Sequence, residues 1–287
     1  MLFSDAEGRI SDQAPRISLL DHGFLFGDSI YEVLRTYDGL LFGWQEHMDR
    51  LAQSARRLAL PLEPLLPEIA KRADALLAQL GEPNAAIRIF VTRGVGKLHI
   101  DPRSCTKPVI YMAAWPFDAG VHLKPLRLAV TKIQRLTIES LDPAIKSGNY
   151  LNAVLAFHEA IELGYDDAIL LNSKGEVAEL TTSNIGWISN GKIVTPATGS
   201  GILYGITRKL CLDCDGGMVE GHYTESDLKK AEEVFALSTF KEIVPVTEVR
   251  FSDGSIKSFS NSTKTKEFHE KLKRRIAVAL KSCRKVC

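Results

Sequence analysis

The chain has 287 residues, with 36 Lys plus Arg against 35 Asp plus Glu, 45% hydrophobic residues and 25% charged residues. This composition is typical of a soluble globular protein, and the formal net charge of +1 argues against a general nucleic-acid binder. The sequence contains neither an apolar run of about 20 residues nor a signal peptide. We therefore expect a cytoplasmic protein without membrane or nucleic-acid partners.

The five cysteines do not form a convincing metal or disulfide pattern. Cys211 and Cys214 make a C-x-x-C inside a predicted helix, and no second pair follows at the spacing of a zinc ribbon. Cys283 and Cys287 lie at the tail. We interpret the cysteines as inert thiols and expect no metal.

The length favours two domains, because one domain takes about 100 to 200 residues. The first part alternates helix and strand patterns, and the aperiodic stretch PFDAGVHLK that follows resembles a linker. We predict a domain over 1–117, a linker over 118–124 and a second domain over 125–287. In the first domain we expect helices over 46–60, which Pro61 ends, and over about 65–80, which Gly81 ends, and strands over 29–37, 85–92 and 109–115.

The second half predicts a longer mixture of strands and helices. Asn190-Gly191 is a strong two-residue hairpin signal, NSKG is a weaker one, and both predict antiparallel strands. Thr224 and Asp227 have the spacing of a capping box. We expect strands over 126–132, 167–171, 176–180, 184–189, 192–196, 233–238 and 243–249, and helices over 149–164, from about 205, from 224, and at the C-terminus with Phe268, Leu272, Ile276 and Leu280 on one face.

Two residues have the chemistry that a pyridine-aldehyde cofactor needs. Lys146 lies in the loop DPAIKSGNYLNAV without neighbouring charges, where a lysine amine can form an imine. Glu179 ends a predicted strand, where an acid can keep a pyridine nitrogen protonated. The hydroxyl residues that follow it, up to Ser183, and then Asn184 are placed to reach a phosphate. A solvated lysine and a strand-end acid are the alternatives.

A phosphate site is also predicted at the start of a helix. In TPATGSGILYGITRKL, Gly205 permits close approach, the amides of Ile206 and Thr207 begin a helix, and Thr207 adds a hydroxyl. Arg50 can supply the balancing cation. Every helix has such a terminus, so this signal is weak by itself.

A candidate substrate surface lies in the stretch DHGFLFGDSIYEVLRTYDG. Side chains alternate along a strand, so Tyr31, Val33 and Arg35 share one face. This face offers an apolar wall, a phenol and a guanidinium, which suit a substrate with both a carboxylate and a hydrocarbon part.

Together these segments resemble the class IV, fold-type IV pyridoxal-phosphate enzymes. This family includes branched-chain aminotransferases, D-amino acid aminotransferases, (R)-amine transaminases and aminodeoxychorismate lyases. The resemblance covers nearly the whole chain. It rests on DHGFLFGDSIYE, EHMDRL, IKSGNYLN, EVAELTTSNI, TP followed by ILYGITR, and FALSTFKEIVPV, all in the family's order.

The resemblance implies a role for each matching residue. Lys146 is the catalytic lysine that forms the Schiff base with pyridoxal 5'-phosphate, Glu179 is the partner of the pyridine nitrogen, and Leu203 packs on the ring. Tyr150 lies beside the ring hydroxyl. The remaining cofactor contacts are Arg50, Ser183, Asn184, Gly205, Ile206, Thr207, Ser238 and Thr239, and the substrate contacts are Tyr31, Val33, Arg35, Arg88 and His99.

The resemblance also implies a fold and a reaction. The expected fold is α/β (α+β), with a small N-terminal α/β sandwich, a larger C-terminal pseudo-barrel with flanking helices, and the cofactor at their interface in a homodimer. The expected reaction transfers an amino group between an amino acid and a keto acid by a ping-pong mechanism.

The substrate is the most open part of this assignment. Arg35, Arg88 and Tyr150 resemble branched-chain enzymes, whereas Val33 stands where many of these have glycine. Leu98 replaces the carboxylate-binding arginine of D-amino acid enzymes, beside Lys97 and His99. We predict a transaminase for branched-chain L-amino acids and 2-oxoglutarate. The alternatives are a D-amino acid or (R)-amine transaminase, a 4-amino-4-deoxychorismate lyase, and a catalytically silent binding protein.

Overall fold

The computed structural model describes residues 1–286, and these divide into two compact units. Unit 1 contains Met1–Asp118, Ile145–Asn149 and the described residues from 279 to 286. Unit 2 contains Ala119–Ala144 and Tyr150–Val278. The segment with Lys146 and the C-terminal tail thus lie with the N-terminal residues, whereas the sequence placed both in the second domain.

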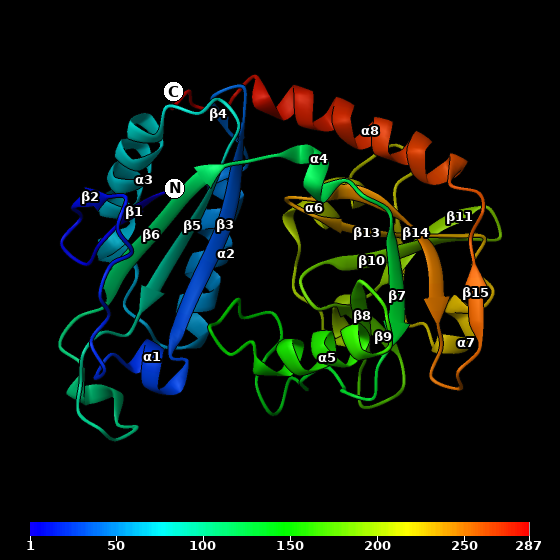
Figure 1. Ribbon diagram of the computed structural model, residues 1–287, viewed down its shortest axis with the longest axis horizontal. Coiled ribbons are helices and arrows are strands. Elements are labelled where there is room, and N and C mark those ends of the chain that lie inside the picture. Colours follow the sequence, from blue (N-terminus) through cyan, green and yellow to red (C-terminus); the bar gives the residue numbers. More distant parts are fainter. Residues whose placement is uncertain (287) are drawn as a thin grey trace. The chain divides into compact units, whose positions relative to one another are not determined.

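Unit 1 is built on a six-stranded sheet in the order β2-β1-β6-β5-β3-β4 (Figure 1). All neighbouring strands pair antiparallel, and the central pair β3 and β5 is aligned from Ser29 opposite Thr92 to Arg35 opposite Ala86. The strands are β1 (Leu2–Ser4), β2 (Ile10–Ser11), β3 (Ser29–Tyr37), β4 (Leu40–Leu41), β5 (Ala85–Thr92) and β6 (Val109–Pro116).

Two helices cover one face of this sheet, α2 (Trp44–Arg57) against β3 and α3 (Leu66–Leu80) against β5 and β6. A short helix, α1 (His22–Phe26), precedes β3. The core between sheet and helices is apolar, because alternate residues of each strand point toward the helices. Its members include Ile30, Leu34, Leu51, Ile69, Leu76, Ile87 and Ile89.

The C-terminal tail joins unit 1 through an isolated β-bridge, in which Lys285 lies opposite Leu40 of β4. Leu41 N donates to Arg284 O at 3.1 Å, Val286 N donates to Gly39 O at 2.9 Å, and Val286 joins the unit 1 core. The Arg284 guanidinium stacks on Trp44, 4.1 Å from the ring centroid, and its Nη2 lies 2.9 Å from Asp74 Oδ1. Cys287, one of the tail cysteines considered above, lies outside the described residues.

Unit 2 is built on a nine-stranded sheet in the order β12-β11-β10-β13-β14-β7-β8-β9, with β15 also paired to β14. The sheet curls, because β9 at one end contacts β10 and β11 near the other end. The strands are β7 (Leu126–Val130), β8 (Asp167–Leu171), β9 (Val177–Leu180), β10 (Asn184–Ser189), β11 (Lys192–Pro196), β12 (Val219–Gly221), β13 (Glu233–Ser238), β14 (Glu242–Arg250) and β15 (Ile256–Ser258).

Helices flank this curled sheet, as Figure 1 shows for α5 beside β8. The ring of Phe268 in α8 packs 5.9 Å from that of Phe235 in β13, measured between centroids. The helices are α4 (Ala119–His122), α5 (Leu151–Glu162), α6 (Ile206–Leu212), α7 (Glu225–Leu228) and α8 (Thr263–Leu280). The small α/β unit and the half-barrel confirm the predicted fold class.

Most predicted elements are confirmed, and the differences have local causes. Asn190 and Gly191 both adopt positive φ angles, +49° and +74°, as the predicted hairpin turn requires. The expectation of antiparallel strands in the second half was incomplete, because β7 pairs parallel with both β8 and β14. The predicted linker contains the short helix α4, and α2 ends at Arg57, before Leu60.

Within residues 1–286, every helix is too short or too polar to traverse a lipid bilayer. Cys211 and Cys214 are both unbridged and buried, and burial raises the pKa of each thiol. A raised pKa keeps a thiol protonated and poorly nucleophilic, which agrees with their interpretation as inert side chains.

We expect truncation after Leu280 to destabilise unit 1. The change removes the buried Val286 side chain and two backbone hydrogen bonds, so the free energy of unfolding should fall by about 2 kcal/mol. Urea denaturation followed by fluorescence measures this loss. The substitution Val278→Ser, at an exposed position of α8, is the control. Equal stability of the truncated and full chains would show that the tail contributes nothing.

Candidate active site

The segment that carries Lys146 is held against the beginning of β3. Tyr31 N donates to Lys146 O at 3.0 Å, and Gly148 N donates to Ser29 O at 2.8 Å. Glycine at 148 leaves the Ser29 hydroxyl in place, because a β-carbon there would lie 2.2 Å from Ser29 Oγ. The motif IKSGN therefore forms a short stretch of backbone pairing that fixes the direction of the lysine side chain.

The Lys146 amine lies over an aromatic ring. Its Nζ atom is 3.5 Å from the Tyr31 hydroxyl and 4.5 Å from the centroid of the Tyr31 ring. The backbone of Lys146 is anchored separately, since its N–H donates to Ser54 Oγ at 3.1 Å. Lys146 is half-buried, so its amine is held in a defined place without being sealed in the core.

The predicted substrate face of β3 is confirmed as a face of the sheet. Tyr31 stands opposite Phe90, and Val33 stands opposite Arg88, on the side away from the core residues Ile30 and Leu34. The Arg88 guanidinium lies 4.2 Å from the Tyr31 centroid and 4.7 Å from the Phe90 centroid. Tyr31 thus contacts both Lys146 and Arg88.

Arg35, on the same face, is more enclosed. It is 4% exposed, and its guanidinium stacks 3.9 Å from the Tyr37 centroid and 4.1 Å from the Phe117 centroid. These two rings hold the plane of the guanidinium group against aromatic surface. Arg35 therefore forms the buried end of the wall that Tyr31 and Arg88 continue.

Arg50 faces the other side of β3, where it meets a buried acid. Glu32 accepts from Arg50 Nε and Nη2, at 2.7 Å each, and from His47 Nδ1 at 2.7 Å. Burial raises the pKa of Glu32, but the Arg50 charge and the hydrogen bonds from Arg50 and His47 together outweigh burial, so the pKa falls to about 2. Burial also lowers the pKa of His47. Glu32 is therefore ionised and His47 neutral at pH 7.

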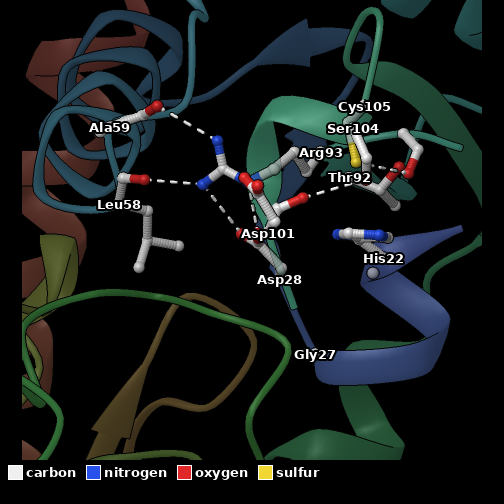
Figure 2. A network of polar contacts seen from close by, with 12 residues as sticks. His22, Gly27, Asp28, Leu58, Ala59, Thr92, Arg93, Asp101, Ser104 and Cys105 are labelled. Carbon is white, nitrogen blue, oxygen red and sulfur yellow. Dashed lines mark hydrogen bonds and ion pairs between the residues drawn. The ribbon is translucent and has the colours of Figure 1, made fainter. Parts of the chain in front are cut away.

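His99 lies in the exposed loop between β5 and β6, whose base is anchored by the polar network in Figure 2. Arg93 pairs with Asp28 and donates to the carbonyl oxygens of Leu58 and Ala59, at 2.7 and 3.2 Å. Further bonds join His22 Nε2 to Lys97 O at 3.0 Å and Lys97 N to Ser104 Oγ at 3.1 Å. The loop base is thus ordered, while His99 itself faces solvent.

In unit 2, Glu179 is a buried acid whose oxygens are held by donors. Arg135 Nη2 lies 2.8 Å from Oε1, and Oε2 accepts from Asn184 Nδ2 and from Leu203 N, at 3.1 Å each. The arginine keeps a buried carboxylate ionised. Asn184 also donates to Leu203 O at 3.0 Å, so the predicted residues Glu179, Asn184 and Leu203 do lie together.

The hydroxyl groups predicted to bind a phosphate lie at the ends of neighbouring elements of unit 2. Thr207 and Ile206 begin α6 and are buried, and Ser183 precedes β10, beside Ser238 and Thr239 at the end of β13. Close packing keeps Gly205 without a side chain, because a β-carbon there would lie 2.1 Å from Asn184 Oδ1. Tyr150, half-buried, is the N-cap residue of α5.

Ser183 has a partner that the sequence did not suggest. The buried Lys241 amine donates to Ser183 Oγ at 3.0 Å, and burial lowers the pKa of Lys241 although Asp167 opposes the shift. Asp167 accepts from the Thr181 hydroxyl at 2.6 Å. Asp167 and Lys241 therefore hold the two ends of the hydroxyl stretch, at Thr181 and Ser183.

Sequence reasoning missed Arg135, Lys241 and Glu32. Glu32 did leave a signal, because an acid occupies a core-facing position of the alternating strand SIYEVLRTY. Arg135 and Lys241 left none, since each reaches its partner across a long stretch of chain. Their roles follow only from the folded geometry.

Comparisons with known proteins agree with this geometry. The model of the family "Amino-transferase class IV" matches residues 29–249. A Methanocaldococcus jannaschii protein named "Putative branched-chain-amino-acid aminotransferase" is 40% identical over 271 residues, 92% of this chain and 91% of that one. A Staphylococcus epidermidis D-alanine aminotransferase is 33% identical over 84% of this chain and 86% of its own.

A solved structure is similar over the whole chain. It is the T.th. branched-chain amino acid aminotransferase with pyridoxamine 5'-phosphate, with a TM-score of 0.85 and 25% identity over 100% of this chain and 98% of that one. The family match covers most of the chain, and the cofactor in this structure is the amine form of pyridoxal phosphate. The chain therefore belongs to the class IV aminotransferases, and it is a pyridoxal-phosphate-dependent transaminase.

Proposed function

We propose that this transaminase moves the amino group of branched-chain L-amino acids to 2-oxoglutarate by a ping-pong mechanism. The observation that carries the proposal is the wall beside Lys146, where the Tyr31 ring contacts both the lysine amine and the Arg88 guanidinium. The M. jannaschii relative supports the same substrate class through its name.

The residues of this chain fit pyridoxal 5'-phosphate. Lys146 offers a positioned primary amine, Glu179 is a buried carboxylate paired with Arg135, and the glycine at 205 leaves room beside Asn184. When bound, the cofactor supplies an aldehyde that takes up the amino group and a ring that accepts electrons. We propose the remaining contacts from the family resemblance: Arg50, Tyr150, Ser183, Asn184, Leu203, Gly205, Ile206, Thr207, Ser238 and Thr239.

Each charged group then has a defined role. Lys146 would hold the cofactor through its amine and would carry a proton on Nζ during the transfer. Glu179, paired with Arg135, would accept a hydrogen bond from the pyridine nitrogen. Arg50 would bind the phosphate through charge-assisted hydrogen bonds.

Both substrates of a ping-pong reaction must use the same pocket, so one wall has to accept a hydrocarbon and a carboxylate. Val33, Tyr31 and Phe90 offer apolar surface to a branched side chain. Arg88 offers the charge for the side-chain carboxylate of 2-oxoglutarate, and its buried Nε atom has no hydrogen-bond partner among residues 1–286. Arg35 and the loop residue His99 complete the proposed substrate contacts.

D-amino acid transamination is a second candidate, favoured by the 33% identity to a D-alanine aminotransferase. The two functions separate when the protein meets L-leucine and D-alanine in turn, since only the true donor converts the cofactor to its amine form. The cytoplasmic location expected from the sequence stays a prediction.

We expect Lys146→Ala to remove transamination, because the amine that holds the cofactor and carries the proton is lost. Activity with L-leucine and 2-oxoglutarate should fall by at least about 10²- to 10⁴-fold. The imine absorbance and its bleaching by borohydride should disappear, whereas Lys71→Ala, at an exposed position of α3, should behave as wild type. Normal turnover by Lys146→Ala would refute the assignment.

We expect Arg88→Met to discriminate between the two half-reactions. Methionine keeps an apolar side chain on the Tyr31 ring and removes the charge. Single-turnover reaction with L-glutamate should slow about tenfold or more, and reaction with L-leucine should change little. Arg103→Met, at an exposed position of the β5–β6 loop, is the matched control. Equal losses with both amino acids would contradict the proposed role of Arg88.

We also propose that the chain forms a homodimer, with α5 covered by a second copy. Ala153, Ala156 and Ala160 bury one face of α5, while the other face exposes large apolar side chains. These are Leu151, Val154, Leu155 and Ile161, between 48% and 69% exposed, at spacings of three, four and ten residues from the first. An exposed row of large apolar side chains is typical of an interface, and twofold homodimers are the commonest soluble assemblies.

We expect Leu155→Glu to weaken this dimer. The charge would have to be buried without a partner, so light scattering after gel filtration should show a monomer. Val278→Glu on α8, 61% exposed, should keep the mass of the wild type. A wild-type monomer, or a dimer unaffected by Leu155→Glu, would exclude this interface.

A further inference from the structure

We propose that Glu32 is a positioning residue that makes this protein select the phosphorylated form of its cofactor. In this inference Glu32, supported by His47, fixes the Arg50 guanidinium in the orientation that binds the phosphate. The inference rests on the proposed function, in which Arg50 contacts the cofactor phosphate.

The geometry of the pair fixes the plane of the guanidinium. Glu32 Oε1 accepts from Arg50 Nε and Oε2 accepts from Nη2, each at 2.7 Å. Two parallel bonds of this kind define one orientation, which a single bond would not. Because the guanidinium is planar and rigid, these two bonds also set the plane in which the other N–H donors of Arg50 lie.

The acid is buried more deeply than the arginine it holds. The Glu32 side chain is 0% exposed and the Arg50 side chain 9% exposed. Glu32 also occupies a core-facing position of β3, between Ile30 and Leu34, where the strand pattern calls for an apolar residue. A buried charge is costly unless it is paired, so its presence at this position indicates a specific role.

His47 holds the carboxylate from a second side without adding charge. Burial lowers the pKa of His47, so the imidazole is neutral and its one proton lies on Nδ1, which donates to Glu32 Oε2 at 2.7 Å. His47 and Arg50 lie one turn apart on α2 and therefore share a helix face. The trio carries one negative and one positive charge.

Removing the Glu32 charge has two opposite effects on the affinity of Arg50 for a phosphate, one through charge and one through orientation. A carboxylate beside Arg50 weakens the attraction of that arginine for a phosphate, so charge alone predicts tighter phosphate binding without it. Orientation predicts weaker binding, because a released arginine side chain must lose its rotamer freedom on binding. We infer that orientation dominates, since the fork and the His47 bond leave the guanidinium a single arrangement.

The test compares cofactor with and without its phosphate. Full-length apo-protein is titrated with pyridoxal 5'-phosphate and with pyridoxal, and the imine absorbance gives a dissociation constant for each. The wild type should prefer the phosphorylated compound. Glu32→Gln should weaken binding of pyridoxal 5'-phosphate about tenfold and leave binding of pyridoxal unchanged. Glu68→Gln, which alters another Glu–Arg pair of unit 1, should change neither.

A second variant keeps the test decisive if Glu32→Gln does not fold. Arg50→Lys retains the positive charge but cannot form the two parallel bonds to Glu32, so it should lose the preference for pyridoxal 5'-phosphate over pyridoxal. Adding Glu32→Gln to this variant should not weaken binding further. Equal losses for both compounds, or tighter binding of pyridoxal 5'-phosphate by Glu32→Gln, would overturn the inference. If the wild type forms no imine with either compound, the proposed function itself fails and the inference with it.

Discussion

The alternation of side chains along β3 is the constraint on which unit 1 depends. Tyr31 points to one side of the sheet, where it contacts Lys146 and Arg88, and Glu32 points to the other side, where it holds Arg50. Because the two residues are neighbours on one buried strand, the Lys146 amine and the Arg50 guanidinium share a common support. A shift of β3 by one residue would exchange the two faces and disrupt both groups together.

The acid in unit 2 is stabilised by the same kind of arrangement. Glu179 pairs with Arg135, just as Glu32 pairs with Arg50, and each carboxylate is also held by uncharged donors. A buried carboxylate without such partners would take up a proton and lose its value as an acceptor for a pyridinium N–H. The two arginines therefore differ in their proposed roles. Arg135 stabilises the charge of Glu179, whereas Glu32 fixes the orientation of Arg50.

Local sequence patterns predicted most of the fold. They predicted a site residue only where its position follows from the residues next to it in the sequence. The period of two in SIYEVLRTY indicated the face with Tyr31, and the Asn190-Gly191 turn indicated a hairpin. The segment DHGFLFG, for which no helix was predicted, forms α1, and the Asp21 side chain caps this helix. Partners such as Arg135 for Glu179, and Lys241 for Ser183, come from distant segments, so no spacing in the sequence could indicate them.

The substrate wall shows why an arginine can serve a transaminase that must accept both hydrocarbon and carboxylate. A lysine ammonium on this wall would be strongly hydrated and would keep water against the branched side chain. The Arg88 guanidinium is planar and weakly hydrated, and its faces rest on Tyr31 and Phe90, so it adds little cost to an apolar occupant. Its edge still offers N–H donors when a carboxylate arrives. One rigid wall would therefore accommodate both proposed substrates in turn, without requiring the strands β3 and β5 to move.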